Sequence, residues 1–266
     1  MCYLRLVQAL AACLLAAACA PMPDLPPVQP YDVAALAATR YKAVLVAGDG
    51  RLPVFDNAVE GMASHLREGG LSAADVQRLS AAPAVVAQEG VRSATLDRVL
   101  GAVRAMRPGL GEGCLVYATS HGAPFRGLSL ATSGEMLTPG ALDRALAQGC
   151  GNAPTVVVIS GCFSGTFAQA PMTRENRVVL TAARADRASF GCGAGRTYTV
   201  YDRCLLDAMS AGGSWRSLQD TIQGCVTTEE RKGRFTPSQP QAWFGSAVAG
   251  LSAPGRTTTS AKAGTL

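Results

Sequence analysis

Residues 155–165 read TVVVISGCFSG, in which five β-branched residues lead directly into a serine, a glycine and a cysteine. A run of this kind is typical of a strand that is buried on both faces of a parallel sheet. Residues 114–119 (CLVYAT) form a second apolar run, which leads in the same way into Ser120, His121 and Gly122. Because open parallel sheets bind ligands beyond the carboxyl ends of their strands, the residues after these two runs are the first candidates for function.

Other apolar runs alternate with segments of helical periodicity along most of the chain. Further strands are expected at residues 42–47, 127–131 and 177–183. Helices are expected over 56–68 with Asp56 as N-cap, after Ser93 as N-cap, and from Pro139 with Thr138 before it. Continuous apolar strands separated by helices predict an α/β fold, with a mostly parallel sheet and helices on both faces. With 266 residues, of which 48% are hydrophobic, the chain can bury such a core.

The two strand ends carry complementary chemistry. If both strands lie in one parallel sheet, His121 and Cys162 emerge at the same edge, where a thiol and an imidazole make a nucleophile and its proton partner. Gly122 and Gly161 have no side chains, so a substrate backbone can approach closely and backbone N–H groups can face a developing oxyanion. A helix N-terminus after Cys162 would further favour the thiolate. The sequence therefore predicts a catalytic cysteine–histidine pair.

The order of these residues along the chain excludes two other catalytic arrangements. An α/β-hydrolase has its catalytic histidine after the nucleophile, whereas no histidine follows His121. Papain-like peptidases place the cysteine before the histidine, which is opposite to the order in this chain. His65, the only other histidine, falls on a predicted helix, where we expect it to be solvated or packed.

A histidine–glycine turn followed 41 residues later by a cysteine after glycine resembles the caspase-like cysteine peptidases, and most closely the legumain family with its bacterial lipoprotein relatives. The resemblance covers about residues 42–210, with further matching segments at 44–48 (VLVAG), 179–183 (VLTAA) and 188–192 (ASFGC). It implies a caspase-like three-layer sandwich and hydrolysis of a peptide bond through an acyl-enzyme. By the same resemblance Cys162 is the nucleophile, His121 transfers the proton, and the backbone N–H groups of Gly122 and Cys162 form the oxyanion hole.

The resemblance also bears on the substrate-binding pocket. By this resemblance the chain is expected to cleave after Asn or Asp. The asparagine-accepting pocket of the family uses a carboxylate two residues before the nucleophile, where this chain has Ser160. Ser189 matches a serine of the pocket wall, and Asp202 stands near the position of a pocket acid. Asp56 and Asn57 lie after the first strand, where the family has further pocket residues, but they do not align securely.

Two other functions remain open at this stage. The first is a transpeptidase or transamidase, in which an amine instead of water resolves the same acyl-enzyme. The second is an envelope lipoprotein without enzymatic activity that uses the cleft for binding. The presence of both His121 and Cys162 argues against a pure binding protein, which has no chemical need for the pair.

The first residues resemble an export signal. Residues 1–19 have a positive start, an apolar run too short to span a bilayer, and small residues before Cys19. This pattern predicts a lipoprotein signal with lipidation at Cys19, although Cys13 has a similar context and a plain secretory leader is the alternative. We expect a proline-rich tether at 20–38, a peptidase domain at 39–250 and a flexible tail at 251–266. The protein is then exported to the bacterial cell envelope, lipid-anchored and facing the periplasm.

Six cysteines follow the leader, namely Cys114, Cys150, Cys162, Cys192, Cys204 and Cys225. Cysteines tend to pair in an oxidising compartment. If Cys162 is the working thiol, at most two bridges form and one further thiol stays free. Cys192 and Cys204 either bridge across the loop that closes the pocket or are each buried unpaired.

The composition limits the partners. The net charge of +5 comes without a run of basic residues, which excludes a nucleic-acid surface. No two cysteines have CxxC spacing, so a zinc site built on cysteine pairs is not expected. We expect a peptide or protein substrate, with no metal ion and no organic cofactor.

Overall fold

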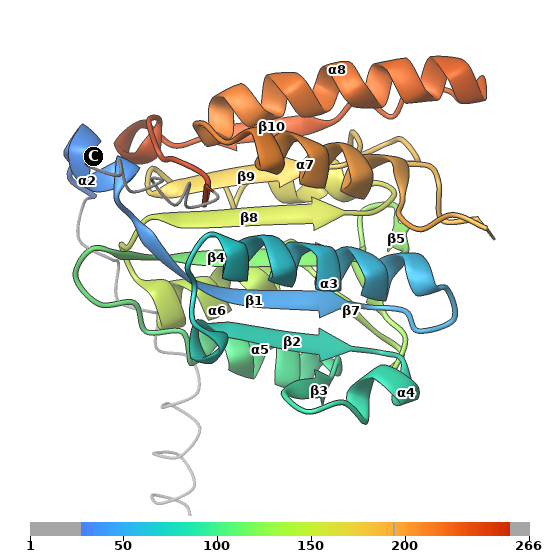
Figure 1. Ribbon diagram of the computed structural model, residues 1–266, viewed down its shortest axis with the longest axis horizontal. Coiled ribbons are helices and arrows are strands. Elements are labelled where there is room, and N and C mark those ends of the chain that lie inside the picture. The colour runs from blue at the N-terminus through green and yellow to red at the C-terminus, as the bar shows by residue number, and fades with distance from the viewer. Residues whose placement is uncertain (1–27, 194, 256–266) are drawn as a thin grey trace, which may run out of the picture.

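The computed structural model describes residues 28–193 and 195–255, so the predicted signal and Cys19 lie outside the described residues. A seven-stranded sheet in the order β10-β9-β8-β4-β1-β2-β3 forms the centre of the fold (Figure 1). Neighbouring strands are parallel except that β10 runs antiparallel to β9. The mostly parallel α/β sheet predicted from the sequence is confirmed.

The strands of the central sheet are β1 (Arg40–Ala47), β2 (Val76–Ser80), β3 (Val91–Ser93), β4 (Glu112–Thr119), β8 (Thr155–Ser160), β9 (Arg177–Thr181) and β10 (Gln241–Phe244). A second, antiparallel sheet consists of β5 (Gly122–Ala123), β6 (Gly127–Leu130) and β7 (Glu135–Leu137). The α-helices are α2 (Val33–Ala37), α3 (Pro53–Glu68), α4 (Pro83–Val86), α5 (Leu96–Arg104), α6 (Pro139–Cys150), α7 (Val200–Ala211) and α8 (Trp215–Gly233). None of the helices in the described part is long and apolar enough to cross a membrane.

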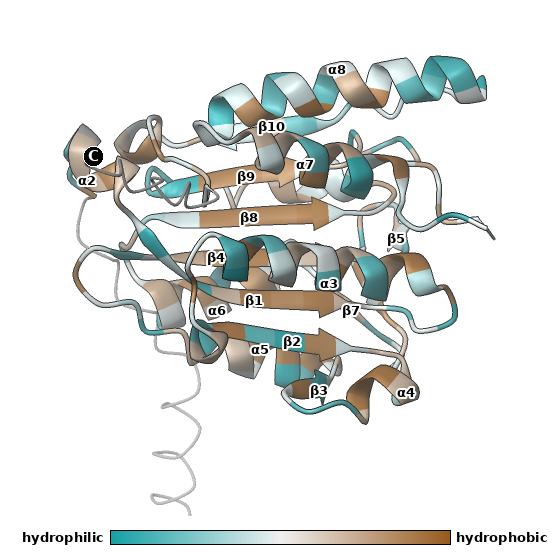
Figure 2. Cartoon of the chain, viewed as in Figure 1, coloured by the Kyte–Doolittle hydropathy of each residue, from teal (hydrophilic) through white to brown (hydrophobic). Residues whose placement is uncertain are grey.

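Helices cover both faces of the central sheet. One hydrophobic core joins one face to α3, α7 and α8, and the other joins the opposite face to α5 and α6. Successive strand residues alternate between the two cores, as Val44 and Leu45 of β1 do. The central strands are accordingly the most apolar part of the molecule (Figure 2). This is the predicted three-layer arrangement.

Two predicted helix starts are wrong. The first helix begins at Pro53 rather than at Asp56, because Pro fits the first helical turn and Val54 and Phe55 are already buried. Asp56 therefore lies inside α3 instead of capping it. Ser93 ends β3, and the side chain of Thr95 caps α5. The helix from Pro139 is confirmed, with Thr138 as its N-cap.

Several elements were not predicted. β2 and β3 lie at one edge of the sheet, where exposed side chains interrupt the apolar pattern. β10 closes the other edge. The strand predicted at 127–131 exists as β6, but it belongs to the small antiparallel sheet that directly follows His121.

The packed chain extends beyond the predicted domain boundaries. In the predicted tether, α2 is capped by Asp32, and Leu36 is buried against the core. In the predicted tail, Leu251 and Ala253 are buried. Described residues on both sides of the predicted 39–250 domain therefore contribute to its packing, because the amino-terminal edge of the sheet has apolar surface to cover.

Two disulfides join cysteines of neighbouring elements. Cys114 of β4 pairs with Cys150 of α6, and Cys204 of α7 pairs with Cys225 of α8. A bridge between Cys192 and Cys204 is therefore excluded, because Cys204 faces α8. Cys162 and Cys192 are free, which agrees with the expectation of two bridges and one further free thiol beside Cys162.

Candidate active site

The carboxyl ends of β1, β4 and β8 lie level with one another. Pairing between the strands places Ala47 beside Thr119, and Thr119 beside Ser160. The ladder continues one residue further, since the N–H of Gly48 donates to Thr119 and the N–H of Ser120 donates to Ser160, both at 3.0 Å. The three turns that follow these strands consequently emerge side by side.

His121 lies in the turn after β4. Its carbonyl oxygen accepts a hydrogen bond of 2.8 Å from the N–H of Ser129 in β6, so the small antiparallel sheet holds the backbone of this turn. The imidazole packs edge-on against the ring of Phe55, with the ring centroids 5.3 Å apart. About 40% of the side chain is exposed. The ring is thus held in place and still accessible to a substrate.

Cys162 lies in the turn after β8 and is half-buried. Its sulfur lies 3.4 Å from the backbone nitrogen of Ser189 and 3.5 Å from the carbonyl oxygen of the same residue. A thiol can donate to that oxygen, and a thiolate can accept from that N–H. The Ser189 backbone can therefore hold the sulfur in either protonation state.

One cavity contains both side chains. It is lined by Phe55, Ser120, His121, Ser160, Gly161, Cys162, Ser189, Phe190, Cys192 and Thr199. The structure thus brings His121 and Cys162 together at the carboxyl edge of the sheet. Ser160 and Ser189, both predicted from the sequence, lie in the same cavity.

Two glycines allow the two turns to touch. A Cβ atom on Gly122 would collide with the carbonyl oxygen of Cys162. A Cβ atom on Gly161 would lie 2.7 Å from the carbonyl oxygen of Ser120, which is closer than real Cβ contacts. Any side chain at either position would push the histidine turn away from the cysteine turn.

The helix expected after Cys162 is not a full helix. Phe163 adopts a left-handed conformation with φ of 59°, and residues 164–168 form a short 3₁₀ helix. A helix this short has little macrodipole. Local contacts such as that with the Ser189 N–H are therefore the better source of stabilisation for a thiolate.

Asp49 is a site residue that the sequence reasoning missed. It lies in the turn after β1, its side chain is fully buried, and its Oδ2 lies 4.0 Å from Nε2 of His121. Hydrogen bonds from the Arg51 side chain lower the pKa of Asp49 below its ordinary value, and His121 contributes in the same direction. Its position in the sequence could have indicated this role, since Asp49 follows an apolar strand as His121 and Cys162 do.

Asp202 lies beneath the cavity rather than on its wall. Its carboxyl group is fully buried and accepts hydrogen bonds from Tyr117 at 2.7 Å, Thr119 at 2.9 Å and Thr199 at 2.8 Å. The Ser160 hydroxyl is a fourth donor. Burial raises the pKa of Asp202 above its ordinary value, although the hydrogen bonds from these donors act to lower it. Asp202 therefore ties α7 to the ends of β4 and β8 instead of contacting a ligand directly.

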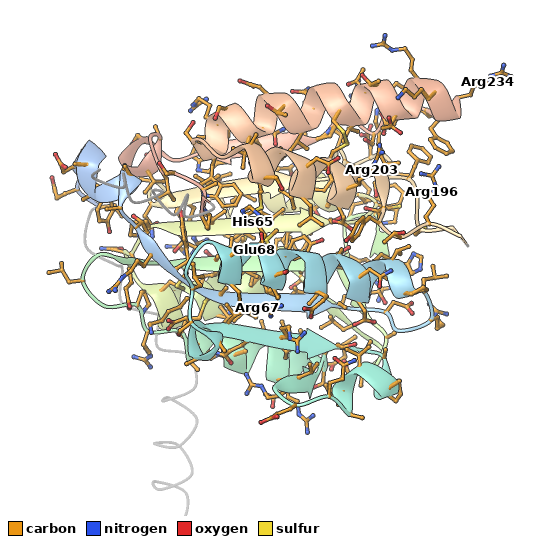
Figure 3. The ribbon with its side chains drawn as sticks, viewed as in Figure 1. His65, Arg67, Glu68, Arg196, Arg203 and Arg234 are labelled. Atoms are coloured by element: carbon orange, nitrogen blue, oxygen red, sulfur yellow. A yellow bond between two sulfur atoms is a disulfide. The ribbon has the colours of Figure 1, made fainter. Side chains whose placement is uncertain are left out.

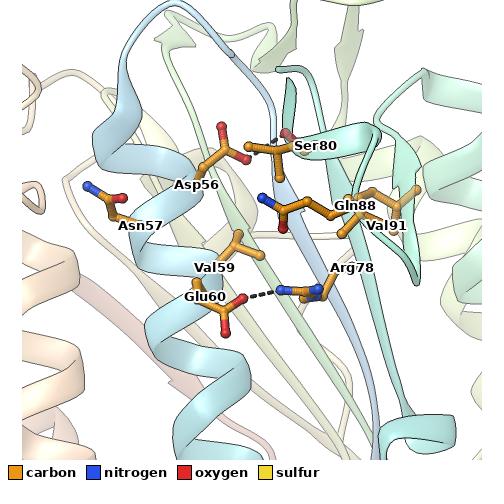
Figure 4. Close-up of a pocket in the computed structure, with 10 residues that line it drawn as sticks. Asp56, Asn57, Val59, Glu60, Arg78, Ser80, Gln88 and Val91 are labelled. Carbon is orange, nitrogen blue, oxygen red and sulfur yellow. Dashed lines mark hydrogen bonds and ion pairs between the residues drawn. The ribbon is translucent and has the colours of Figure 1, made fainter. Parts of the chain in front are cut away.

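Asp56 and Asn57 do not line the cavity of His121 and Cys162. Asp56 faces a neighbouring cavity of about 220 Å³ between α3 and β2, where its Oδ1 accepts a hydrogen bond of 2.5 Å from Ser80 (Figure 4). The Asn57 side chain donates to the carbonyl oxygen of Thr197 at 3.0 Å and so fastens the loop before α7. The neighbouring residue that lines the cavity of His121 and Cys162 is Phe55.

His65 lies along α3, away from the carboxyl ends of the strands (Figure 3). It is buried, and its Nε2 lies 3.0 Å from the carbonyl oxygen of Pro254. The packing role expected for this histidine is confirmed. Within the described residues, no three His, Cys, Asp or Glu side chains are grouped in a way that could hold a metal ion.

Comparisons with known proteins bear on this geometry. The sequence model of the peptidase C13 family matches residues 95–229, which include His121, Cys162 and Asp202. A search of curated proteins finds no match. Among solved structures, the fold is similar to the crystal structure of caspase-1 from Spodoptera frugiperda, with a TM-score of 0.57 and 12% identity. That alignment covers 85% of this chain and 94% of the caspase chain, and it supports a caspase-like fold.

Replacing Asp202 by Asn tests its bracing role. The amide group cannot accept from all four hydroxyls, so we expect the free energy of unfolding to fall by about 1–3 kcal/mol in urea denaturation. Asp207→Asn, an exposed change on the same helix, should alter it by less than about 0.5 kcal/mol. Equal stability of wild type and Asp202→Asn would contradict the role.

Proposed function

Because the chain belongs to the peptidase C13 family and is a cysteine peptidase by that membership, we propose that it hydrolyses peptide bonds with Cys162 as nucleophile and His121 as proton carrier. The observation that carries the proposal is the single cavity lined by both side chains. A thiol and an imidazole on adjoining turns are what acyl transfer requires.

In the proposed mechanism, the Cys162 thiol gives its proton to His121 and its sulfur attacks the scissile carbonyl carbon, so that a C–S bond forms and the C=O π bond opens. The N–H groups of Gly122 and Cys162 stabilise the resulting oxyanion. His121 gives a proton to the departing amine as the C–N bond breaks, which leaves an acyl-enzyme. A water molecule, deprotonated by His121, then attacks the acyl group and releases Cys162.

Asp49 positions His121 in this scheme. Its buried carboxylate lies 4.0 Å from Nε2 and attracts this edge of the imidazole ring. It also favours the ring orientation in which Nδ1 faces away from Asp49. The hydrogen bonds from Arg51 keep Asp49 ionised, since they lower its pKa.

The hydroxyls in the cavity favour a substrate with Asn rather than Asp before the scissile bond. Ser160 and Thr199 both donate to Asp202, so their oxygens can only accept from a ligand. The side-chain amide of Asn supplies N–H donors, whereas an Asp carboxylate does not. Of the described residues that line this cavity, none is Asp, Glu, Lys or Arg, so an Asp side chain would find no fixed positive charge.

The cavity must widen to take such a side chain. Its free volume is about 10 Å³, roughly the room for one water molecule. One wall consists of Ser189, Phe190, Cys192 and Thr199, and movement of these side chains outward would open the pocket.

The proposed location of the protein is the bacterial envelope. The leader at 1–19 and the prolines that follow it support an exported domain attached through a lipid on Cys19. Two disulfides in the described part are typical of an exported protein. The substrates would then be peptides or proteins of the periplasm.

Cleavage of a peptide library tests the proposed dyad. Wild type should cleave, most rapidly after Asn, because the pocket oxygens accept from an amide. Cys162→Ala should show no turnover, and His121→Ala should lose roughly 10²-fold or more in kcat/KM. His65→Gln is the control and should keep its activity.

Unchanged turnover in Cys162→Ala would remove Cys162 from the mechanism. Cleavage after residues other than Asn would overturn the pocket assignment alone. Formation of a ligated product with an added amine would mean that an amine resolves the acyl-enzyme instead of water.

Asp49→Asn tests the positioning of His121. We expect kcat/KM to fall by roughly tenfold to a hundredfold, with most of the loss in kcat, because the imidazole loses its orientation. Since the pKa of Asp49 is lowered, its charge is lost only below the ordinary carboxyl range. The ratio of wild type to variant should therefore stay constant across the neutral range in a pH profile.

Asp220→Asn, an exposed change on α8, should leave that profile unaltered. An Asp49→Asn variant with the kcat of the wild type would show that Asp49 does not position His121.

Metabolic labelling with a fatty-acid analogue tests the anchor. Label should appear on the wild-type chain and disappear in Cys19→Ser, because the acyl chains are attached through that residue. Absence of label from the wild type would leave a plain secretory leader as the explanation of residues 1–19.

A further inference from the structure

Cys192 is the free cysteine that the proposed mechanism does not use. Four of the six cysteines in the described part are paired in the two disulfides, which leaves Cys162 and Cys192. Both are half-buried and line the same cavity. The chain therefore has two reduced thiols in one small space.

The contacts of Cys162 bring it close to the segment that carries Cys192. Its sulfur contacts the backbone of Ser189, three residues before Cys192. Burial raises the pKa of the Cys192 thiol, and the nearby Cys162 adds to this effect. The cavity that both side chains line has a free volume of only about 10 Å³.

The backbone is packed before Cys192 and open after it. A Cβ atom on Gly193 would meet no heavy atom within 4 Å, whereas one on Gly191 would lie 2.6 Å from the backbone nitrogen of Val200. On either side the loop is fastened, because Phe190 stacks on Phe235 with centroids 4.6 Å apart and Thr197 accepts from Asn57. Cys192 thus lies between two fastened points of the loop, with open space beside the residue that follows it.

We propose that Cys192 is a resolving thiol, which forms a reversible disulfide with Cys162 after a hydroperoxide has oxidised Cys162. Its regulatory consequence, blockage of peptide hydrolysis, rests on the function proposed above. The disulfide itself does not depend on that function.

The chemistry proceeds in two steps. The Cys162 thiolate attacks the O–O bond of the hydroperoxide, so an S–O bond forms, hydroxide or alkoxide leaves, and the sulfur is oxidised while the peroxide is reduced. The Cys192 thiolate then attacks the Cys162 sulfur, so the S–S bond forms and the S–O bond breaks. The departing hydroxide takes up a proton to give water. A thiol reductant cleaves this disulfide by exchange, which returns Cys162 and Cys192 to thiols while the reductant is oxidised to its own disulfide.

A resolving thiol protects the nucleophile. Without one, a second hydroperoxide converts sulfenic acid to sulfinic acid, which a thiol reductant does not restore. The disulfide stops oxidation at a state from which Cys162 can be recovered. Its position in the cavity also removes the sulfur from reach of a substrate.

The test is peptide mapping by mass spectrometry of the full chain after treatment with an excess of hydrogen peroxide, because sulfinic acid forms only when a second peroxide reacts with the same sulfur. Free thiols are alkylated before the mapping. In the wild type we expect a peptide containing Cys162 linked to one containing Cys192, with loss of the link after reduction. In Cys192→Ser we expect Cys162 as sulfinic acid, retained after reduction. The two structural disulfides, which should stay intact before reduction, report on the fold.

A wild-type chain in which Cys162 becomes sulfinic acid while Cys192 remains an alkylated free thiol would overturn the proposal. So would complete recovery of Cys162 in Cys192→Ser. Because the readout is mass, a linked pair in a chain that cleaves no peptide would support this inference and overturn only the proposed function. An active chain whose two thiols stay unlinked would overturn only this inference.

Discussion

The site depends on the level register of β1, β4 and β8. It also depends on the buried carboxyl group of Asp202, which holds the ends of β4 and β8 together. Asp202 accepts hydrogen bonds from hydroxyls on β4, on β8 and at the start of α7. A buried carboxyl group is costly unless its hydrogen bonds are satisfied, and four donors satisfy this one. The same contacts fix the ends of the two strands from which His121 and Cys162 emerge.

Given that register, a few individual residues determine how the turns after the strands lie relative to one another. Glycine at 122 and 161 lets the two turns approach, since a side chain at either position would separate them. Asp49 comes to His121 because β1 ends level with β4. The hydroxyls bound to Asp202 then give the cavity its acceptor character. In the function proposed above, support of the strands and recognition of the substrate therefore draw on one network.

The sequence predicted the features that depend on short-range pattern. Continuous β-branched runs indicated the buried strands, and the residues after β4 and β8 indicated His121 and Cys162. The sequence predicted Asp202 as a substrate-binding residue near the position of a pocket acid. Its bracing role was missed because two of its hydroxyl partners, Tyr117 and Thr119, lie more than 80 residues away in β4, where no local pattern links them to it. The Cys204–Cys225 pairing depends on which faces of α7 and α8 meet, and helical spacing alone does not specify those faces. The strands at the two sides of the sheet, β10 on one side and β2 and β3 on the other, lacked the apolar pattern on which strand prediction depends.

The central claim is that the sulfur of Cys162 takes up the acyl group of a substrate beside His121. The most direct measurement is the mass of the intact chain quenched in acid during turnover of a peptide ester, followed by fragmentation to locate the added mass. The account predicts an acyl group on Cys162 that disappears as the ester is consumed. An acyl group on another residue, or an unmodified chain during active turnover, would contradict it.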